Sequence, residues 1–417
     1  MAGPTHIEMM TTLAYAKGAY SAAIELGSEG HPANLLLDTG SSSTVVLPHA
    51  YPAERDRLLA PTAWAQRIKY GAGAWAGPVI ASQVTVGEGR HRRRLAAAHF
   101  AVVKSKAQDF RDCDGLLGLA FRPLDRAHDV TALLAAQGVD PAHTWPWPFD
   151  VDDPENFERF KLQLREQPRL TLRPLFSALE EEGIVADKFA LVVRRSLVRV
   201  LEEGADARRL ALDPFNRGTL VLGGGEECAR LYEGGFRAVK IVHERYYNCR
   251  LIAVSVGDQP RIPAPPLDAE DEAAYASNAI VDTGCSFLVL ERSLHAAVME
   301  CFARHDAALP PLIARARELA RTERGLANAA FDNRRWPDLH FHLESPDGDE
   351  TTITVDPGDY WQRNAVHAGE CWFLLMDQLP SWPRQTILGL PLLSGRYCVF
   401  DRRGTGVLRL ARAAADE

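Results

Sequence analysis

The tripeptide Asp-Thr-Gly occurs twice in this chain, each time directly after three apolar residues. The first copy begins at Asp38 and the second at Asp282. A carboxylate at the end of a buried strand costs free energy unless hydrogen bonds satisfy it. The glycine two residues on permits a tight turn that brings backbone N–H groups towards the carboxylate oxygens. The repetition therefore predicts a duplicated unit that contributes one acid per copy.

The surroundings of the two copies are similar in plan. Each copy leads into a second apolar run, and each is followed later by two apolar residues and a glycine, at 116–118 and at 387–389. Between them lie short runs with the period-2 alternation and flanking turn residues that are typical of strands. We therefore predict an all-β, bilobal fold of two related barrel-like lobes with short helices.

The chain has 417 residues, more than one ordinary hydrophobic core supports. We expect an N-terminal lobe over 1–205, with the first Asp-Thr-Gly, and a C-terminal lobe over 206–417, with the second. Residues 122–172 lack strand periodicity and are expected to be an inserted, largely surface segment. Its aromatic stretch at 145–149 could be a recognition patch, but covering the lobe's own apolar flank is favoured. The Ala, Arg and Glu content of about 294–330 predicts a helical insertion.

Composition excludes several classes of function. A net charge of −8 gives no support to a nucleic-acid partner. The sequence contains no run of eighteen apolar residues, so a membrane span is not predicted. The seven cysteines are scattered without a Cys-x-x-Cys pair, so neither a metal site nor a cofactor is predicted. The odd cysteine count, the absence of Asn-x-Ser/Thr and an N-terminus without a secretory pattern favour the cytoplasm and a fold independent of disulfides.

With these motifs in place, the sequence resembles the pepsin family of aspartic peptidases over most of its length. The segments that carry the resemblance are the two Asp-Thr-Gly loops, Tyr70-Gly71-Ala72-Gly73, which is similar to the family's flap, and the segments 114–120, 336–339 and 387–401. The family implies a bilobal all-β fold with the active-site cleft between the lobes. The chain looks most like the propeptide-less, non-secreted members from bacteria.

The resemblance assigns roles to individual residues. The two aspartates would be catalytic, the flap would close over the substrate, and the neighbours of the aspartates would fix the carboxylates. The assignments are Asp38 and Asp282 as catalytic residues, Tyr70, Gly71 and Gly73 as flap, and Thr39, Gly40, Ser41, Thr283, Gly284 and Cys285 as supports of the dyad.

One support departs from the family pattern. Cys285 stands where the family usually has Thr or Ser, whose hydroxyl donates to the second carboxylate. A thiol is a weaker donor, so we expect Cys285 to stabilise the anionic form of Asp282 less well. Ser41, in contrast, retains a hydroxyl and is expected to donate to Asp38.

The function that the resemblance implies is that of an aspartic endopeptidase acting on extended polypeptides. It would be a monomer with an acidic optimum and a preference for hydrophobic residues around the scissile bond, and pepstatin-type compounds would inhibit it. The alternative is an inactive binding protein on the same scaffold, but such relatives usually lose an active-site aspartate or the flap. A hydrolase using Cys285 is disfavoured, because neighbouring carboxylates oppose a thiolate and no histidine is placed by sequence to activate it.

Overall fold

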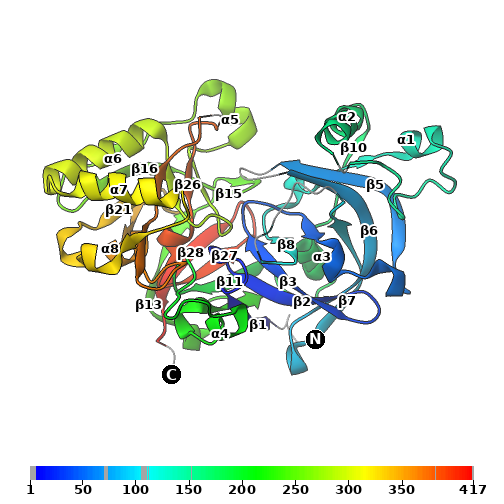
Figure 1. Ribbon diagram of the computed structural model, residues 1–417, viewed down its shortest axis with the longest axis horizontal. Coiled ribbons are helices and arrows are strands. Elements are labelled where there is room, and N and C mark those ends of the chain that lie inside the picture. Colours follow the sequence, from blue (N-terminus) through cyan, green and yellow to red (C-terminus); the bar gives the residue numbers. More distant parts are fainter. Residues whose placement is uncertain are drawn as a thin grey trace. The chain divides into compact units, whose positions relative to one another are not determined.

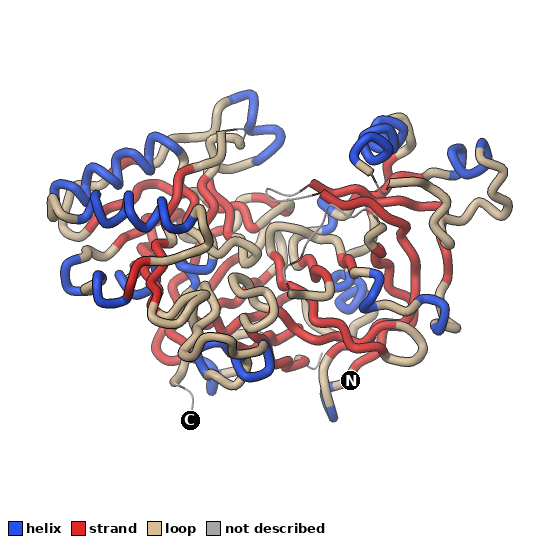
Figure 2. The backbone as a smooth tube through the Cα atoms, in the orientation of Figure 1, coloured by secondary structure: helices blue, strands red, loops and turns tan. Residues whose placement is uncertain are grey.

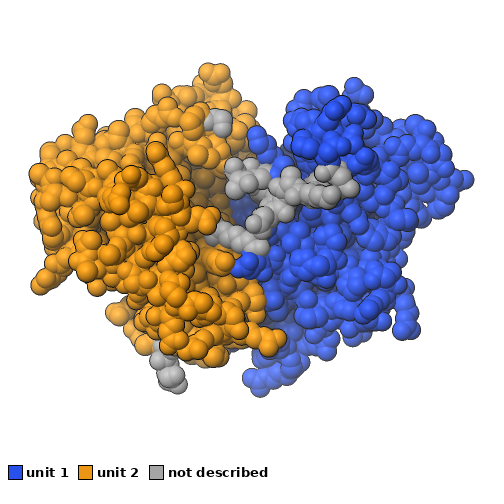
Figure 3. Space-filling view, viewed as in Figure 1, with its two compact units in different colours: residues 1–9, 21–186 blue, residues 10–20, 187–417 orange. Residues whose placement is uncertain are grey.

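The computed structural model describes residues 6–69, 74–104, 110, 112–151, 153–380 and 382–415 (Figure 1). Strands predominate over helices in the described residues taken together, which confirms the all-β expectation (Figure 2). The chain divides into two compact units, unit 1 with residues 1–9 and 21–186 and unit 2 with residues 10–20 and 187–417 (Figure 3). The chain passes between the units three times: inside β1 (Ile7–Thr12), between residues 20 and 21, and between residues 186 and 187.

This division differs from the boundary expected after residue 205. The reason is the pairing of β11 (Lys188–Val193), which lies between β12 (Arg217–Leu222) and β27 (Arg396–Asp401). The early segment joins the same unit because the Tyr20 hydroxyl accepts hydrogen bonds from the backbone N–H groups of Arg194 and Arg195, at 2.8 and 3.2 Å. Strand pairing over a long sequence separation therefore sets the boundary, and a change in composition does not reveal it.

Unit 1 is a curved sheet with the strand order β10-β9-β5-β6-β7-β4-β8-β3-β2. An additional pairing joins β6 to β2 at Thr85–Glu25 and Val84–Leu26, which closes six of these strands into a barrel. Inside the ring, β3 runs parallel to β8, whereas β4 runs antiparallel to β8. The strands are β2 (Ser21–Leu26), β3 (His31–Asp38), β4 (Thr44–Val46), β5 (Ala60–Lys69), β6 (Ala74–Val86), β7 (Arg93–Val102), β8 (Gly115–Gly118), β9 (Arg126–Asp129) and β10 (Arg169–Thr171).

The segment expected as an insertion, 122–172, packs onto unit 1. It carries two helices, α1 (Thr131–Ala136) and α2 (Pro154–Arg165), and its strands β9 and β10 pair with each other while β9 also pairs with β5. The segment thus contains two short strands although its sequence lacks strand periodicity. Phe149 and Phe160 lie with ring centroids 4.9 Å apart in a buried cluster with Ala65 of β5 and Ala76 of β6. The aromatic side chains cover the unit's own core.

Unit 2 contains several sheets. Their strand orders are β12-β11-β27-β28-β13, β14-β15-β18-β26-β19-β25, β17-β16-β21-β22 and β20-β24-β23. The strands not yet defined are β13 (Tyr232–Lys240), β14 (His243–Glu244), β15 (Tyr247–Cys249), β16 (Leu251–Val256), β17 (Ile262–Pro263), β18 (Ala279–Val281), β19 (Leu288–Leu290), β20 (Leu326–Ala327), β21 (Leu339–Glu344), β22 (Glu350–Val355), β23 (Trp361–Arg363), β24 (Glu370–Phe373), β25 (Leu375–Asp377), β26 (Thr386–Leu388) and β28 (Val407–Ala413).

The second insertion is helical, as its composition predicts. It contains α6 (Arg292–His305) and α7 (Leu309–Ala320), which lie side by side (Figure 1). The Glu291 carboxylate caps α6 by accepting from the backbone N–H groups of Ser293 and Leu294, at 2.8 and 3.0 Å. Helix α6 packs on β16, β17 and β25, and α7 packs on α6 and β24. The remaining helices are α3 (Leu175–Glu181), α4 (Ala207–Leu210), α5 (Ala269–Tyr275), α8 (Pro357–Tyr360) and α9 (Leu390–Leu393).

Within the described ranges, no helix combines the length and the apolar character needed to cross a membrane. All seven cysteines lie in these ranges, and all are free thiols, six of them buried. Burial raises the pKa of Cys249, Cys371 and Cys398 to about 12 each. Because only the thiolate form reacts with disulfides, these three thiols are unreactive at neutral pH.

We expect reductant to leave the thermal stability of this protein unchanged. The physical reason is that the free thiols are packed as small apolar groups and cross-link nothing. The measurement is thermal unfolding followed by circular dichroism with and without excess dithiothreitol. A fall of roughly ten degrees with reductant would contradict the expectation, because losing a structural disulfide typically costs about 2–5 kcal/mol.

Candidate active site

The first Asp-Thr-Gly loop begins where β3 ends. Asp38 is the last residue of that strand, and its side chain is 7% exposed. The backbone N–H of Gly40 donates to Asp38 Oδ1 at 2.7 Å, and the N–H of Leu119 donates to the Asp38 carbonyl oxygen at 2.8 Å. Strand β3 pairs in parallel with β8, and Asp38 lies opposite Gly118. This pairing fixes the backbone of Asp38, while the Gly40 N–H orients its carboxylate.

Close backbone contact between this loop and β8 requires a glycine. A Cβ atom added to Gly118 would lie 2.4 Å from the carbonyl carbon of Ser42, which no side chain tolerates without a shift of the loop. The N–H of Gly118 donates to the Ser43 carbonyl at 3.0 Å, and the Ser42 hydroxyl donates to the Phe121 carbonyl at 2.6 Å. The loop is thus held by β8 and by the residues directly after it.

The second Asp-Thr-Gly loop repeats this construction within unit 2. The N–H of Gly284 donates to Asp282 Oδ1 at 2.8 Å, and the N–H of Asp282 donates to the Leu388 carbonyl at 3.1 Å. Strand β18 runs parallel to β26, and Gly389 follows β26 as the counterpart of Gly118. A Cβ atom on Gly389 would lie 2.4 Å from the Cys285 carbonyl oxygen and 2.3 Å from that of Phe287. The two loops share one design.

The residues expected to support the carboxylates differ in what they do. Thr39 and Thr283 are buried, with 0% and 2% exposure. Ser41 Oγ is buried and has no hydrogen-bond partner among the described residues, so the expected donation to Asp38 is not seen there. The Cys285 thiol donates to the carbonyl oxygen of Phe287 at 3.3 Å, and a thiol has a single proton to give. The flap residues Tyr70, Gly71 and Gly73 lie outside the described residues.

A buried polar cluster under the first loop was missed by the sequence analysis. Asp125 Oδ1 accepts hydrogen bonds from Ser43 Oγ at 2.8 Å and from Gln66 Nε2 at 2.7 Å, and all three side chains are at most 3% exposed. Ser43 belongs to the Asp38 loop and Gln66 to β5, so the cluster joins the two. Asp125 was missed because it stands alone in a segment without periodicity; only its place shortly after 114–120 could have drawn attention to it.

Burial raises the pKa of Asp125 to about 6, because a carboxylate loses its hydration there. The hydrogen bonds from Ser43 and Gln66 and the charge of Arg122 act in the opposite direction and offset only part of this effect. The carboxyl group is therefore neutral in the folded protein at acid pH and becomes charged near pH 6.

The comparison with known families agrees with this geometry. Each of the two compact units is built mainly of strands and holds an Asp-Thr-Gly loop over a glycine, which is the arrangement that the resemblance to aspartic peptidases leads us to expect. The family model described as eukaryotic aspartyl protease matches residues 210–413, a range that includes the Asp282 loop and does not reach Asp38. The match covers 204 of the 417 residues and indicates an aspartic-type endopeptidase, a hydrolase similar to the pepsin-like family.

We expect the alanine substitutions Gly118→Ala and Gly389→Ala each to lower the free energy of unfolding by about 1–3 kcal/mol. The added methyl group would overlap backbone atoms of the Asp-Thr-Gly loop, and relieving that overlap strains the fold. Thermal unfolding of purified variants is the measurement. Gly235→Ala is the matched control, because a Cβ atom at Gly235 meets nothing within 4 Å. Equal midpoints for all three variants would contradict the expectation.

The raised pKa of Asp125 predicts a pH dependence of stability. Between the usual pKa of 3.8 and the folded value of about 6, the folded state binds more protons than the unfolded state, so stability falls as the pH rises through this window. The loss is about 3 kcal/mol, on the scale of 1.36 kcal/mol per unit. Asp125→Asn keeps a hydrogen-bond acceptor and removes the titration.

We therefore expect the urea-unfolding free energies of wild type and Asp125→Asn to diverge between pH 4 and pH 7, with the wild type losing more. The exposed carboxylate of Asp258 provides the control variant Asp258→Asn, which should follow the wild type. Parallel curves for wild type and Asp125→Asn would show that Asp125 does not ionise in this window.

Proposed function

We propose that the protein hydrolyses peptide bonds in extended polypeptides through a catalytic dyad of Asp38 and Asp282. Two carboxylates brought close together cannot both ionise in mildly acidic solution, because like charges a few ångströms apart repel strongly. They share one proton, which provides a base and an acid at the same time and predicts an acidic optimum. Free thiols throughout the chain and the absence of N-glycosylation sequons support action in a reducing compartment such as the cytoplasm.

In this mechanism a water molecule lies between the two carboxyl groups. The ionised carboxylate takes a proton from the water as its oxygen attacks the peptide carbonyl. The protonated carboxyl donates a hydrogen bond to the developing oxyanion, and a proton then passes to the leaving amine as the C–N bond breaks. Tyr70, Gly71 and Gly73 would close over the peptide and exclude bulk water. Thr39 and Thr283 would hold the two loops in place.

The observation that carries the proposal is that two distant parts of the chain build the same loop around an aspartate. In each loop the glycine two residues on donates to Oδ1, at 2.7 Å from Gly40 and 2.8 Å from Gly284. A backbone donor stabilises the charged carboxylate and fixes its orientation. One such loop could be an isolated structural feature, whereas two in one chain supply the pair of groups that this chemistry requires.

The second candidate function is peptide binding without hydrolysis. Its main sequence signature would be the loss of an aspartate, and both are present with their backbone donors in place. Endopeptidase activity is therefore the better supported function. We also propose that the protein acts as a monomer, that hydrophobic residues flank the scissile bond, and that pepstatin-type compounds inhibit it.

We expect Asp38→Asn and Asp282→Asn each to lower kcat at least about a thousandfold, because an amide can replace neither the base nor the acid. The measurement is hydrolysis of an unfolded protein at acid pH, with and without pepstatin, and near-ultraviolet circular dichroism verifies the fold. Asp258→Asn, at an exposed position, controls for the loss of one charge. If either active-site variant keeps more than a tenth of the wild-type rate, the dyad assignment is wrong. Pepstatin binding without any hydrolysis would support the binding protein instead.

A further inference from the structure

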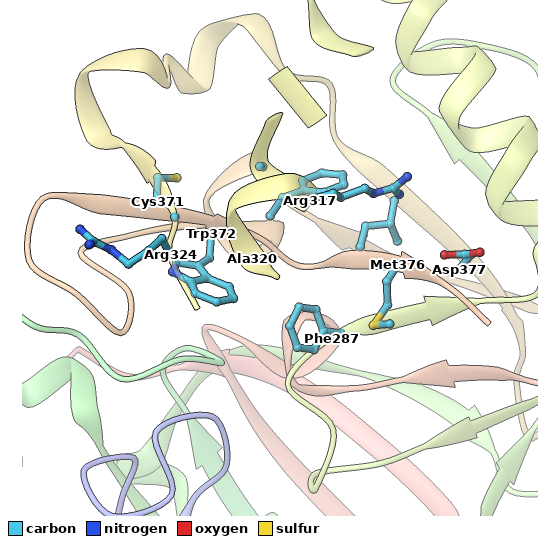
Figure 4. Close-up of a pocket in the computed structure, with 12 residues that line it drawn as sticks. Phe287, Arg317, Ala320, Arg324, Cys371, Trp372, Met376 and Asp377 are labelled. Carbon is cyan, nitrogen blue, oxygen red and sulfur yellow. The ribbon is translucent and has the colours of Figure 1, made fainter. Parts of the chain in front are cut away.

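A cavity of about 320 Å³ in unit 2 borders the loop that carries Asp282. Its floor is aromatic and apolar, and Figure 4 shows Phe287, Trp372 and Met376 around it. Arg317 lines it from α7, and Asp377 lies at one end. The volume is at the lower end of the roughly 300–1,000 Å³ of small-ligand sites, which suits one or two side chains rather than a cofactor.

Phe287 connects this cavity to the Asp282 loop. It stands five residues after Asp282, and its carbonyl oxygen accepts the hydrogen bond from Cys285. The same carbonyl is one of the atoms that exclude a side chain at Gly389. The wall of the cavity is therefore part of the loop that presents the carboxylate, and an occupant of the cavity lies against the proposed catalytic loop.

Arg317 is a half-buried cation on the cavity wall with no carboxylate within 4 Å among the described residues. One of its Nη atoms contacts His295 Nε2 at 2.6 Å, and its guanidinium lies 6.0 Å from the centroid of the Phe373 ring. Burial and the charge of Arg317 lower the pKa of His295 to about 4, so above that pH His295 is a neutral acceptor. His295 therefore accepts a hydrogen bond from Arg317 without neutralising the positive charge of the guanidinium group.

The other charges of the cavity leave this cation dominant. Arg324 forms an ion pair with Glu370 at the far end from Asp377, so its charge is already matched. Asp377 is exposed, and it acts on Arg317 only through a longer-range attraction that partly opposes the lowering of the Arg317 pKa by burial. Water screens an exposed carboxylate more strongly than a half-buried guanidinium. The wall around Phe287 thus combines apolar contact with a guanidinium group that forms no ion pair within 4 Å among the described residues.

We propose that this cavity is a specificity pocket for an acidic side chain of the polypeptide substrate, with Arg317 as the residue that selects it. The inference deepens the proposed function and rests on it. A glutamate side chain would lay its methylenes against Phe287 and Met376 and place its carboxylate towards the Arg317 guanidinium, which is a strong donor to carboxylates. A glutamine of the same shape would gain the apolar contact without the charge. Helix α7 of the helical insertion would therefore restrict the substrates to peptides with an acidic residue at the position that enters this pocket.

The first test is hydrolysis of a peptide library at pH 5.5, above the ordinary glutamate pKa of about 4.3. Wild type should favour Glu or Asp at one fixed position relative to the cleaved bond. Two peptides that differ only in Glu or Gln at that position are then compared. The kcat/KM of the Glu peptide divided by that of the Gln peptide measures the acidic preference, and Arg317→Met should lower this quotient about tenfold. Asp377→Asn should raise it, and Arg321→Met, which removes an exposed cation from the end of the same helix, should leave it unchanged.

The second test does not depend on hydrolysis. 3-Phenylpropionate, which carries an aromatic body and a carboxylate, should quench or shift tryptophan fluorescence of the full-length protein more strongly than its neutral amide. Arg317→Met should abolish that difference. Cleavage without an acidic preference, or a preference that Arg317→Met leaves intact, overturns the proposal while the peptidase function stands. If no peptide is cleaved, the peptidase function fails, and equal binding of the acid and the amide would overturn the pocket as well.

Discussion

The hydrogen bond from a glycine N–H to the aspartate two residues before it is the interaction on which the rest of this structure depends. A carboxylate at the end of a core strand loses hydration that only donors can replace. In each unit the donor comes from the turn that the aspartate itself begins, and a second strand then passes so close beneath that only glycine fits, at Gly118 and at Gly389. The sheet order around these positions follows from that approach, because a parallel neighbour, β8 or β26, must supply the glycine.

This construction explains why the fold class and the two loops could be predicted from the sequence. An apolar strand, an aspartate, a glycine and a later apolar pair with glycine are all local patterns, and each has one physical purpose. The helical insertion was predictable for the same reason, since α6 and α7 show their character in local composition. The boundary between the units was not predictable, because it depends on β11 pairing with β27, some two hundred residues away along the chain.

The side-chain details of the site were also beyond the sequence. A serine or a cysteine has several acceptors within reach of its loop, and the backbone decides among them. Cys285 donates to the Phe287 carbonyl, and Ser41 Oγ finds no partner among the described residues. The partners of Asp125 were equally unpredictable, since nothing in its sequence neighbourhood indicates that the side chains of Ser43 and Gln66 will donate to it. Local patterns place the backbone, and tertiary contacts then assign the polar side chains.

The two insertions illustrate how a duplicated scaffold acquires differences between its halves. In unit 1 Phe149 and Phe160 of the inserted segment are buried in a cluster with residues of β5 and β6, so these side chains serve packing. In unit 2 the helices bury their apolar faces equally well, yet α7 also brings Arg317 to the edge of the loop after Asp282. Arg317 contacts a neutral histidine and an aromatic ring, and it has no carboxylate within 4 Å in the described ranges. The proposed acidic side chain of the substrate would supply the missing carboxylate, and α7 would then contribute to substrate selection as well as to packing.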